Sequence, residues 1–186
     1  MGTVTGMSVL AGPVYAFAGV LGVAGVVKLG RPDDAVRALD AAGLPGSVAA
    51  VRVLGGIEIV AAAAAVAFGG PLSGAILALF YLGFAAFAAR LARRGPSTSC
   101  GCFGAQSVPV TSAHVAINAL GAAVATASIA WPAEPLTVAL ADAPLAGIPF
   151  LVLVLVCGWL VYVALTTLPS LQLAMRELEP ASDGTR

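Results

Sequence analysis

Long apolar runs constrain this chain more than any other feature, because each run is long enough to cross a bilayer. Residues 7–27 form an uncharged run of the length needed to span a hydrocarbon core of about 30 Å. Similar runs cover residues 47–68, 72–89, 110–131 and 148–168. Only 10% of the residues are charged and 60% are hydrophobic, whereas soluble domains carry about a quarter charged residues. The sequence therefore predicts an all-α integral membrane helical bundle with five transmembrane helices in the lipid bilayer.

The first run has one alternative interpretation, a cleaved signal peptide. Such a peptide needs a basic n-region and an apolar region of about 7–15 residues. Residues 1–27 have no basic residue and a longer apolar run. We therefore predict a retained helix.

Glycine and proline residues mark the connections between the runs. Gly69-Gly70-Pro71 predicts a tight hairpin between two antiparallel helices. A turn at residues 30–34 precedes residues 35–39, whose mixture of polar and apolar side chains suits a short helix at the membrane interface. Prolines punctuate the segment before the last run and predict a loop there; they are Pro132, Pro135, Pro144 and Pro149.

The basic residues predict an orientation. With five spans, all nine Lys and Arg residues fall on one side of the membrane. Basic residues are retained on the cytoplasmic side, so we expect a multi-pass protein of the cell membrane with its N-terminus outside and its C-terminus in the cytoplasm. The formal net charge is zero, so no basic field indicates a nucleic-acid partner.

These observations divide the chain into four parts. A four-helix membrane domain covers residues 1–131, and an extracytoplasmic proline-rich loop covers residues 132–147. A fifth transmembrane helix follows at residues 148–169, and residues 170–186 form a polar tail.

The most unusual loop is Cys100-Gly101-Cys102-Phe103-Gly104, which holds two of the three cysteines. Gly101 lets the backbone turn tightly enough to bring both sulfurs together, although a disulfide in so small a ring is strained and easily reduced. The next helix begins at Thr111 or Ser112, either of which suits an N-cap. Free amide groups at that helix end favour thiolate. The cysteine pair is therefore a redox candidate.

Two other interpretations of the cysteines stay open. In the first interpretation, the cysteines form a structural clip, since cysteine packs well as a small apolar residue. In the second, they supply two ligands of a metal site and His114 supplies a third. A closed zinc site needs a fourth ligand, however, and the spacing is not that of a zinc finger. We predict no metal site. Cys157 lies deep in the fifth run, where we expect a core residue.

Glu58 is an acid inside the second run. It lies six residues beyond Arg52, hence about 9 Å deeper in a helix, where a charge is expensive. Small residues share its helical stripe, so Glu58 should point into the bundle. Its functional interpretation is a proton relay or a hydrogen-bonding anchor for a quinone-like molecule. Its structural interpretation is a polar tie between helices, with Lys28 as the candidate partner.

His114 and Asn118 lie four residues apart in the fourth run. They align with the small residues Gly121, Ala122 and Ala125, so both should face the bundle interior. A neutral imidazole near the cysteine loop is able to pass a proton to or from a thiol. The alternative for His114 is a role in helix packing. For Asn118 we expect an interhelical hydrogen bond.

Several short motifs carry a resemblance to a known family. They are GVVKL at residues 25–29, GLP at 43–45, IEI at 57–59 and CGCFG at 100–104, the last followed by a helix with Asn118. Together they resemble the MauE family of methylamine utilisation membrane proteins, within the wider DoxX-like group.

The resemblance implies a DoxX-like four-helix core, with the fifth transmembrane helix as an addition. It also implies a role in maturation of methylamine dehydrogenase, alongside a thioredoxin-like partner, and thus the handling of thiol or disulfide electrons. Disulfide formation in exported proteins takes place outside the cytoplasm, whereas the basic residues place the Cys100 loop on the cytoplasmic side.

The leading hypothesis is a membrane thiol/disulfide redox protein. Cys100 and Cys102 exchange electrons with a thioredoxin-like protein or a quinone, and His114 and Glu58 handle protons, so that these four residues form the catalytic set. The alternative is a non-catalytic accessory or assembly subunit of a larger membrane complex, in which the cysteine loop is a docking clip.

Overall fold

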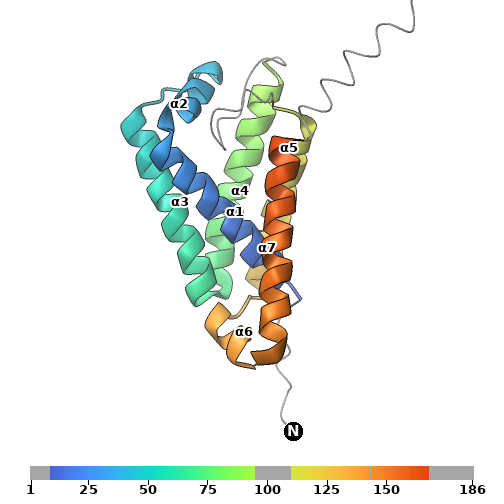
Figure 1. The fold of residues 1–186 in the computed structure, drawn as a ribbon. Coiled ribbons are helices and arrows are strands. Elements are labelled where there is room, and N and C mark those ends of the chain that lie inside the picture. The colour runs from blue at the N-terminus through green and yellow to red at the C-terminus, as the bar shows by residue number, and fades with distance from the viewer. Residues whose placement is uncertain (1–8, 95–109, 143, 168–186) are drawn as a thin grey trace, which may run out of the picture.

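The computed structural model describes residues 9–94, 110–142 and 144–167. All of its regular elements in these ranges are helices (Figure 1). They are α1 (Ala11–Gly30), α2 (Pro32–Ala41), α3 (Val48–Phe68), α4 (Gly70–Ala92), α5 (Ser112–Ala130), α6 (Leu136–Asp142) and α7 (Pro144–Thr166). Five of the described helices, α1, α3, α4, α5 and α7, are long and apolar enough to cross a membrane. The prediction of an all-α membrane bundle is confirmed.

Local chemistry explains the ends of several helices. The hydroxyl of Ser47 accepts a hydrogen bond from the backbone N–H of Ala50 at 3.1 Å and caps α3. The hairpin between α3 and α4 lies at the predicted glycines, because Gly69 and Gly70 have φ of 58° and 80°, which only glycine adopts easily. Pro71 follows in the first turn of α4, where its missing N–H has no intrahelical partner to lose. The predicted short helix is present as α2, and its location at the membrane interface stays a prediction.

The bundle consists of two tightly packed helix pairs, α1 with α3 and α4 with α5, joined by the α3–α4 hairpin. Glycines allow the close approach in both pairs. A Cβ atom on Gly25 of α1 would lie 2.6 Å from the carbonyl oxygen of Gly55 on α3, and one on Gly74 of α4 would lie 2.4 Å from Oγ of Ser128 on α5. These are contacts that only a residue without a side chain permits.

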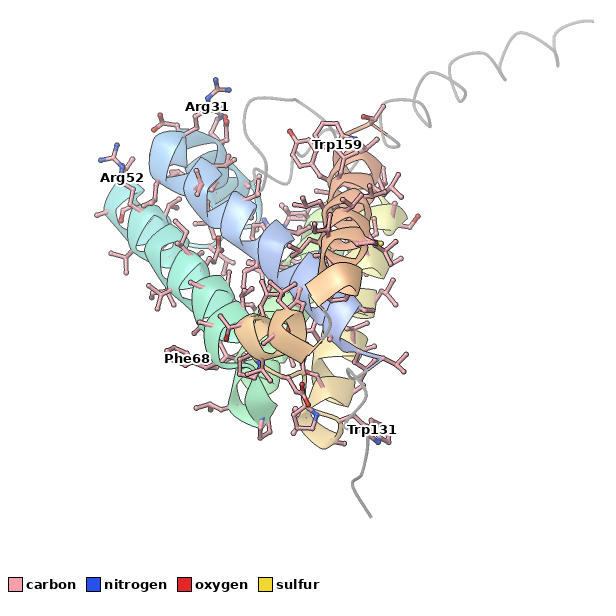
Figure 2. The ribbon with its side chains drawn as sticks, turned by 60° about the horizontal axis from the view of Figure 1, so that its bottom comes forward. Arg31, Arg52, Phe68, Trp131 and Trp159 are labelled. Carbon is pink, nitrogen blue, oxygen red and sulfur yellow. The ribbon has the colours of Figure 1, made fainter. Side chains whose placement is uncertain are left out.

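Arginines gather at one end of the bundle, which we call the arginine end. Arg31 and Arg52 lie there, opposite Phe68 and Trp131 (Figure 2). The C-terminal end of α4 joins them, because Arg90 Nε donates to the Ala42 carbonyl beside α2 at 2.7 Å. A small apolar cluster of Ala38, Ala42, Ala88, Leu91 and Val110 packs beneath these contacts.

The segment between α5 and α7 differs from the predicted loop, because it contains the short helix α6 (Leu136–Asp142). It folds back onto the bundle. The Tyr15 hydroxyl donates to the Glu134 carbonyl, and the Gly70 N–H donates to the Ala133 carbonyl at 3.0 Å. Burying this segment requires its backbone polar groups to be paired, which these bonds and a helical turn achieve.

Helix α7 corrects two sequence predictions. Pro149 lies inside the helix and not in the preceding loop, in the second turn, where its lost hydrogen bond affects only the N-terminal end. Cys157 is exposed and not part of the core, because only one stripe of side chains along α7 packs against the bundle. That stripe includes Phe150, Val154 and Val161, and most of the remaining side chains of the helix face outward (Figure 2).

Candidate functional site

Five polar side chains are buried among the described residues of the bundle: Lys28, Glu58, His114, Asn118 and Ser128. Polar and ionisable groups inside a membrane are costly unless they are paired, so their partners indicate their roles. Ser128 donates to the Ala125 carbonyl on its own helix at 2.7 Å and is thereby accounted for. The other four gather nearer the arginine end.

Lys28 and Glu58 form a buried ion pair between α1 and α3. The Lys28 Nζ donates to Glu58 Oε2 at 2.8 Å, and the two side chains are 5% and 0% exposed. The polar tie that the sequence suggested is therefore present. The second carboxylate oxygen, Oε1, is buried and finds no hydrogen-bond partner within the described part of the chain. This oxygen is consequently available to accept a hydrogen bond or a proton.

The glycine contact between α1 and α3 explains why the pair meets. Gly25 and Gly55 lie against each other, and Lys28 and Glu58 each follow three residues later on their helices. Residues three apart lie on the same face of a helix, so the close approach of the backbones carries both side chains to the same contact. The Lys28 Nζ also lies 5.2 Å from the centre of the Phe84 ring on α4, within the range of a cation–π contact.

His114 lies in the first turn of α5, at its N-terminal end. The N-cap of the helix is Thr111, one of the two predicted candidates, and Ser112 is its first residue. The Thr111 N–H donates to His114 Nδ1 at 3.3 Å, and both His114 and Leu165 of α7 line the cavity described below. An amide N–H only donates, so the Nδ1 that accepts it carries no proton and the proton of the neutral ring lies on Nε2. His114 therefore has a structural role as a cap in addition to any chemistry.

Asn118 does not make the predicted interhelical bond with its amide nitrogen. The Nδ2 group donates instead to the His114 carbonyl on the same helix, at 2.7 Å. This bond lies within reach because the two residues are four apart, one turn of helix. Asn118 thus supports the N-terminal turn of α5 that carries His114.

A small cavity joins these residues, and we call it the polar cavity. It has a volume of about 20 Å³ and its polar lining residues are Lys28, Tyr81, His114 and Asn118. A cavity needs about 10–15 Å³ to hold one water molecule, so this one is large enough for a single water. The structure therefore places His114 and Lys28, the partner of Glu58, on the lining of one cavity.

Tyr81 belongs to this group although the sequence analysis did not include it. Its hydroxyl donates to the Phe17 carbonyl at 2.6 Å, and the residue is buried in the middle of α4. A tyrosine in a membrane helix usually lies at an interface. One sign of a different role for Tyr81 was available in the sequence, since it lies nine residues before Arg90 in an otherwise apolar run and therefore away from the end of the span.

Cys100 and Cys102 lie outside the described residues. The described flanks of their segment are Arg94, after the end of α4, and Val110, before the start of α5. Both flanks belong to the arginine end, because Arg94 Nη1 donates to the Ala41 carbonyl at 3.1 Å and Val110 packs in the apolar cluster there. In the described part of the chain, no three His, Cys, Asp or Glu side chains come together as a metal site requires.

One comparison with known proteins identifies a family. The family model described as methylamine utilisation protein MauE matches residues 7–133. Neither the curated proteins nor the solved structures contain a match. The matched segment holds α1 to α5 and leaves α6 and α7 outside, in agreement with a four-helix DoxX-like core that carries a fifth transmembrane helix. The chain therefore belongs to the MauE family of methylamine utilisation membrane proteins.

Proposed function

We propose that this membrane protein is a thiol/disulfide redox protein whose working pair is Cys100 and Cys102. In this proposal it exchanges electrons with a thioredoxin-like protein or a quinone and serves the maturation of a redox enzyme, a role like that in methylamine dehydrogenase assembly. The observation that carries the proposal is the polar cavity. His114 and Lys28 line it, and His114 lies in the first turn of α5, the helix that follows the cysteine pair in the sequence.

The redox step is a two-electron exchange. Oxidation of the two thiols forms one S–S bond and releases two protons and two electrons, and a quinone that takes up both becomes a quinol. With a thioredoxin-like partner, a thiolate attacks the partner's disulfide, and a mixed disulfide carries the electrons across. The same steps run in reverse when the partner is the reductant.

Protons have to follow the electrons, and two residues of the bundle are suited to accept them. His114 Nδ1 accepts a long bond from the Thr111 N–H at 3.3 Å, and the Thr111 hydroxyl lies 3.4 Å from the same nitrogen. Glu58 Oε1 is without a described hydrogen-bond partner. His114 follows Cys102 by 12 residues in the sequence, and a neutral imidazole is able to take up or release a proton in thiol chemistry.

We also propose that the arginine end faces the cytoplasm, with the N-terminus outside and the segment between α5 and α7 extracytoplasmic. All the described Lys and Arg residues lie in α1, α2, α3 or α4 at the ends that form the arginine end or in the turns next to them. Trp131 and Trp159 lie near opposite ends of the bundle (Figure 2), as expected of aromatic residues at the two membrane interfaces.

Thiol trapping of the purified protein tests the proposal. The protein is alkylated before and after addition of dithiothreitol or decylubiquinone, and the number of modified cysteines is counted. We expect Cys100 and Cys102 to change state together, while Cys157 stays reduced. Cysteines that never change state, together with full function of the double variant Cys100→Ser/Cys102→Ser, would contradict it and favour a non-catalytic assembly subunit.

A further inference from the structure

A second, larger cavity is also lined by Lys28, and we call it the phenylalanine cavity. It has a volume of about 300 Å³ and lies between α1, α2, α3 and α4. This volume is at the lower end of the range for small-molecule sites, about 300–1,000 Å³. Its walls are apolar side chains, among them Leu39, Leu54, Phe80, Phe84 and Phe87, with Lys28 as the charged lining residue. Such a lining suits an apolar ligand that carries one or a few polar atoms.

Lys28 determines which kind of polar group in a ligand the cavity favours. An ammonium group has three N–H donors, and one of them is directed at Glu58 Oε2. The ion pair is neutral as a unit, so a ligand carboxylate would bring an uncompensated negative charge beside Glu58, which is expensive in this environment. A neutral carbonyl oxygen accepts a hydrogen bond from the ammonium without that charge. The pair therefore favours a neutral carbonyl compound.

The aromatic side chains determine the shape. Phe80, Phe84 and Phe87 recur at helical spacing along one face of α4. The rings of Phe80 and Phe84 have centroids 6.1 Å apart. Aromatic rings pack favourably in offset or edge-to-face geometry against another flat ring. A flat carbonyl-bearing ring matches this wall better than a saturated acyl chain, which offers nothing to Lys28.

The cavity is accessible from the lipid. Leu79 lines it and is 73% exposed on the outer surface of α4, so the mouth opens within the membrane-spanning part of the helix. A ligand dissolved in the bilayer can enter without crossing water. From Phe87 to the end of α4 at Ala92 is five residues, or about 7.5 Å along the helix, which brings the ligand to the helix end that leads into the cysteine segment.

We propose that the phenylalanine cavity binds the ring of a lipid-soluble quinone, with one carbonyl oxygen accepting from Lys28 Nζ and the isoprenoid chain leaving past Leu79. This site rests on the proposed redox function and names where its quinone partner binds. It adds Lys28 and Phe84 to the residues that contact a reaction partner.

Equilibrium binding of decylubiquinone to the full chain in nanodiscs tests the site. Gly83 lines the cavity, and no described neighbour lies within 4 Å of a Cβ placed on it, so we expect Gly83→Leu to reduce the space without removing either charge of the ion pair. We expect saturable binding to the wild-type protein, weakened at least about tenfold by Gly83→Leu and by Lys28→Met. Gly56→Leu is the matched control, because Gly56 is also a helical glycine with open surroundings but does not line the cavity; we expect its affinity to be unchanged.

The outcomes separate this site from the redox proposal. Cys100→Ser/Cys102→Ser should bind decylubiquinone as the wild type does, even though it cannot reduce it. Saturable binding with cysteines that never change state would leave the site standing and overturn the redox function. Equal binding by wild type and Gly83→Leu, or uptake that rises linearly with probe in both, would overturn the site, and the latter result would indicate partition into lipid.

Discussion

The Lys28–Glu58 pair is the strongest residue-scale constraint on the bundle. Both side chains are buried, and their contact of 2.8 Å joins α1 to α3. Removing one partner of a buried ion pair leaves an uncompensated charge, which costs far more than the loss of the pair as a unit. The two residues should therefore behave as one unit in mutagenesis.

We expect Glu58→Ala to destabilise the fold by about 3–5 kcal/mol, because Lys28 is left buried without its counter-charge. The double variant Lys28→Met/Glu58→Leu should recover most of that loss, since neither charge remains. Thermal unfolding in detergent measures both. Additive effects of the two single changes would contradict the coupling that the contact implies.

Substitutions of His114 should separate its structural role as a helix cap from its proposed role in proton transfer. Glutamine at the third position of a helix is able to cap as histidine does here, so we expect His114→Gln to keep the melting temperature. The same variant should slow quinone-driven oxidation of the cysteines by about 100-fold, because glutamine cannot take up a proton. His114→Leu should lose both the cap, at about 1 kcal/mol, and the rate. An unchanged oxidation rate in His114→Gln would restrict His114 to its structural role.

At the residue scale, the sequence predicted which polar residues lie inside the bundle better than it predicted their hydrogen-bond partners. Glu58 and His114 stand out because ionisable residues are rare in apolar runs, and Lys28 was a candidate partner for Glu58. The Asn118 amide is able to bond to the carbonyl four residues earlier on its own helix or to a neighbouring helix, and the sequence does not decide between the two. The bond of Tyr81 to Phe17 depends on which carbonyl of α1 the packed helices bring within 3 Å.

At the scale of helices, glycine contacts set the geometry that the polar residues use. Gly25 and Gly55 allow α1 and α3 to cross closely enough for the ion pair to form. We expect Gly25→Ala to destabilise the protein by about 1–3 kcal/mol, because its Cβ would lie 2.6 Å from the Gly55 carbonyl oxygen.

The control for this contact is Gly19→Ala on the same helix. A Cβ there meets no described atom within 4 Å, and alanine has the higher helix propensity, so this variant should be neutral or more stable in the same unfolding assay. Equal destabilisation by both changes would show that the crossing contact is not the cause.

Helix boundaries followed the sequence closely where Gly and Pro act alone, as at the Gly69-Gly70 hairpin. The boundaries of α6 and the buried face of α7 were not predicted. The seven residues of α6 are too few to show a periodicity, and their helical turn starts from the Pro135 carbonyl, which accepts from the N–H groups of Val138 and Ala139. The apolar run of α7 gave no sign of which face is buried, because nearly every position in it is apolar.

The whole molecule has one polarity, with its described basic residues at the arginine end and Phe68 and Trp131 at the other (Figure 2). The number of spans and the grouping of charges were predictable from composition and spacing. Neither cavity was predictable from the sequence, since each is the space left between side chains of at least four helices.

Single cysteines introduced at the two ends test the orientation. In a chain whose native cysteines are replaced by serine, we expect Trp131→Cys to react with a membrane-impermeant maleimide on intact cells. Arg31→Cys should react only in inverted vesicles, because basic residues are retained in the cytoplasm. The opposite pattern would place the arginine end outside and remove the conflict with extracytoplasmic disulfide chemistry.

The central claim is that Cys100 and Cys102 cycle between dithiol and disulfide. Mass spectrometry of the peptide that contains both, taken from native membranes under an oxidised and a reduced quinone pool, tests it most directly. We predict a linked form that lacks two hydrogen atoms in the first condition and a fully alkylated dithiol form in the second. A single form that is the same in both conditions would contradict the claim.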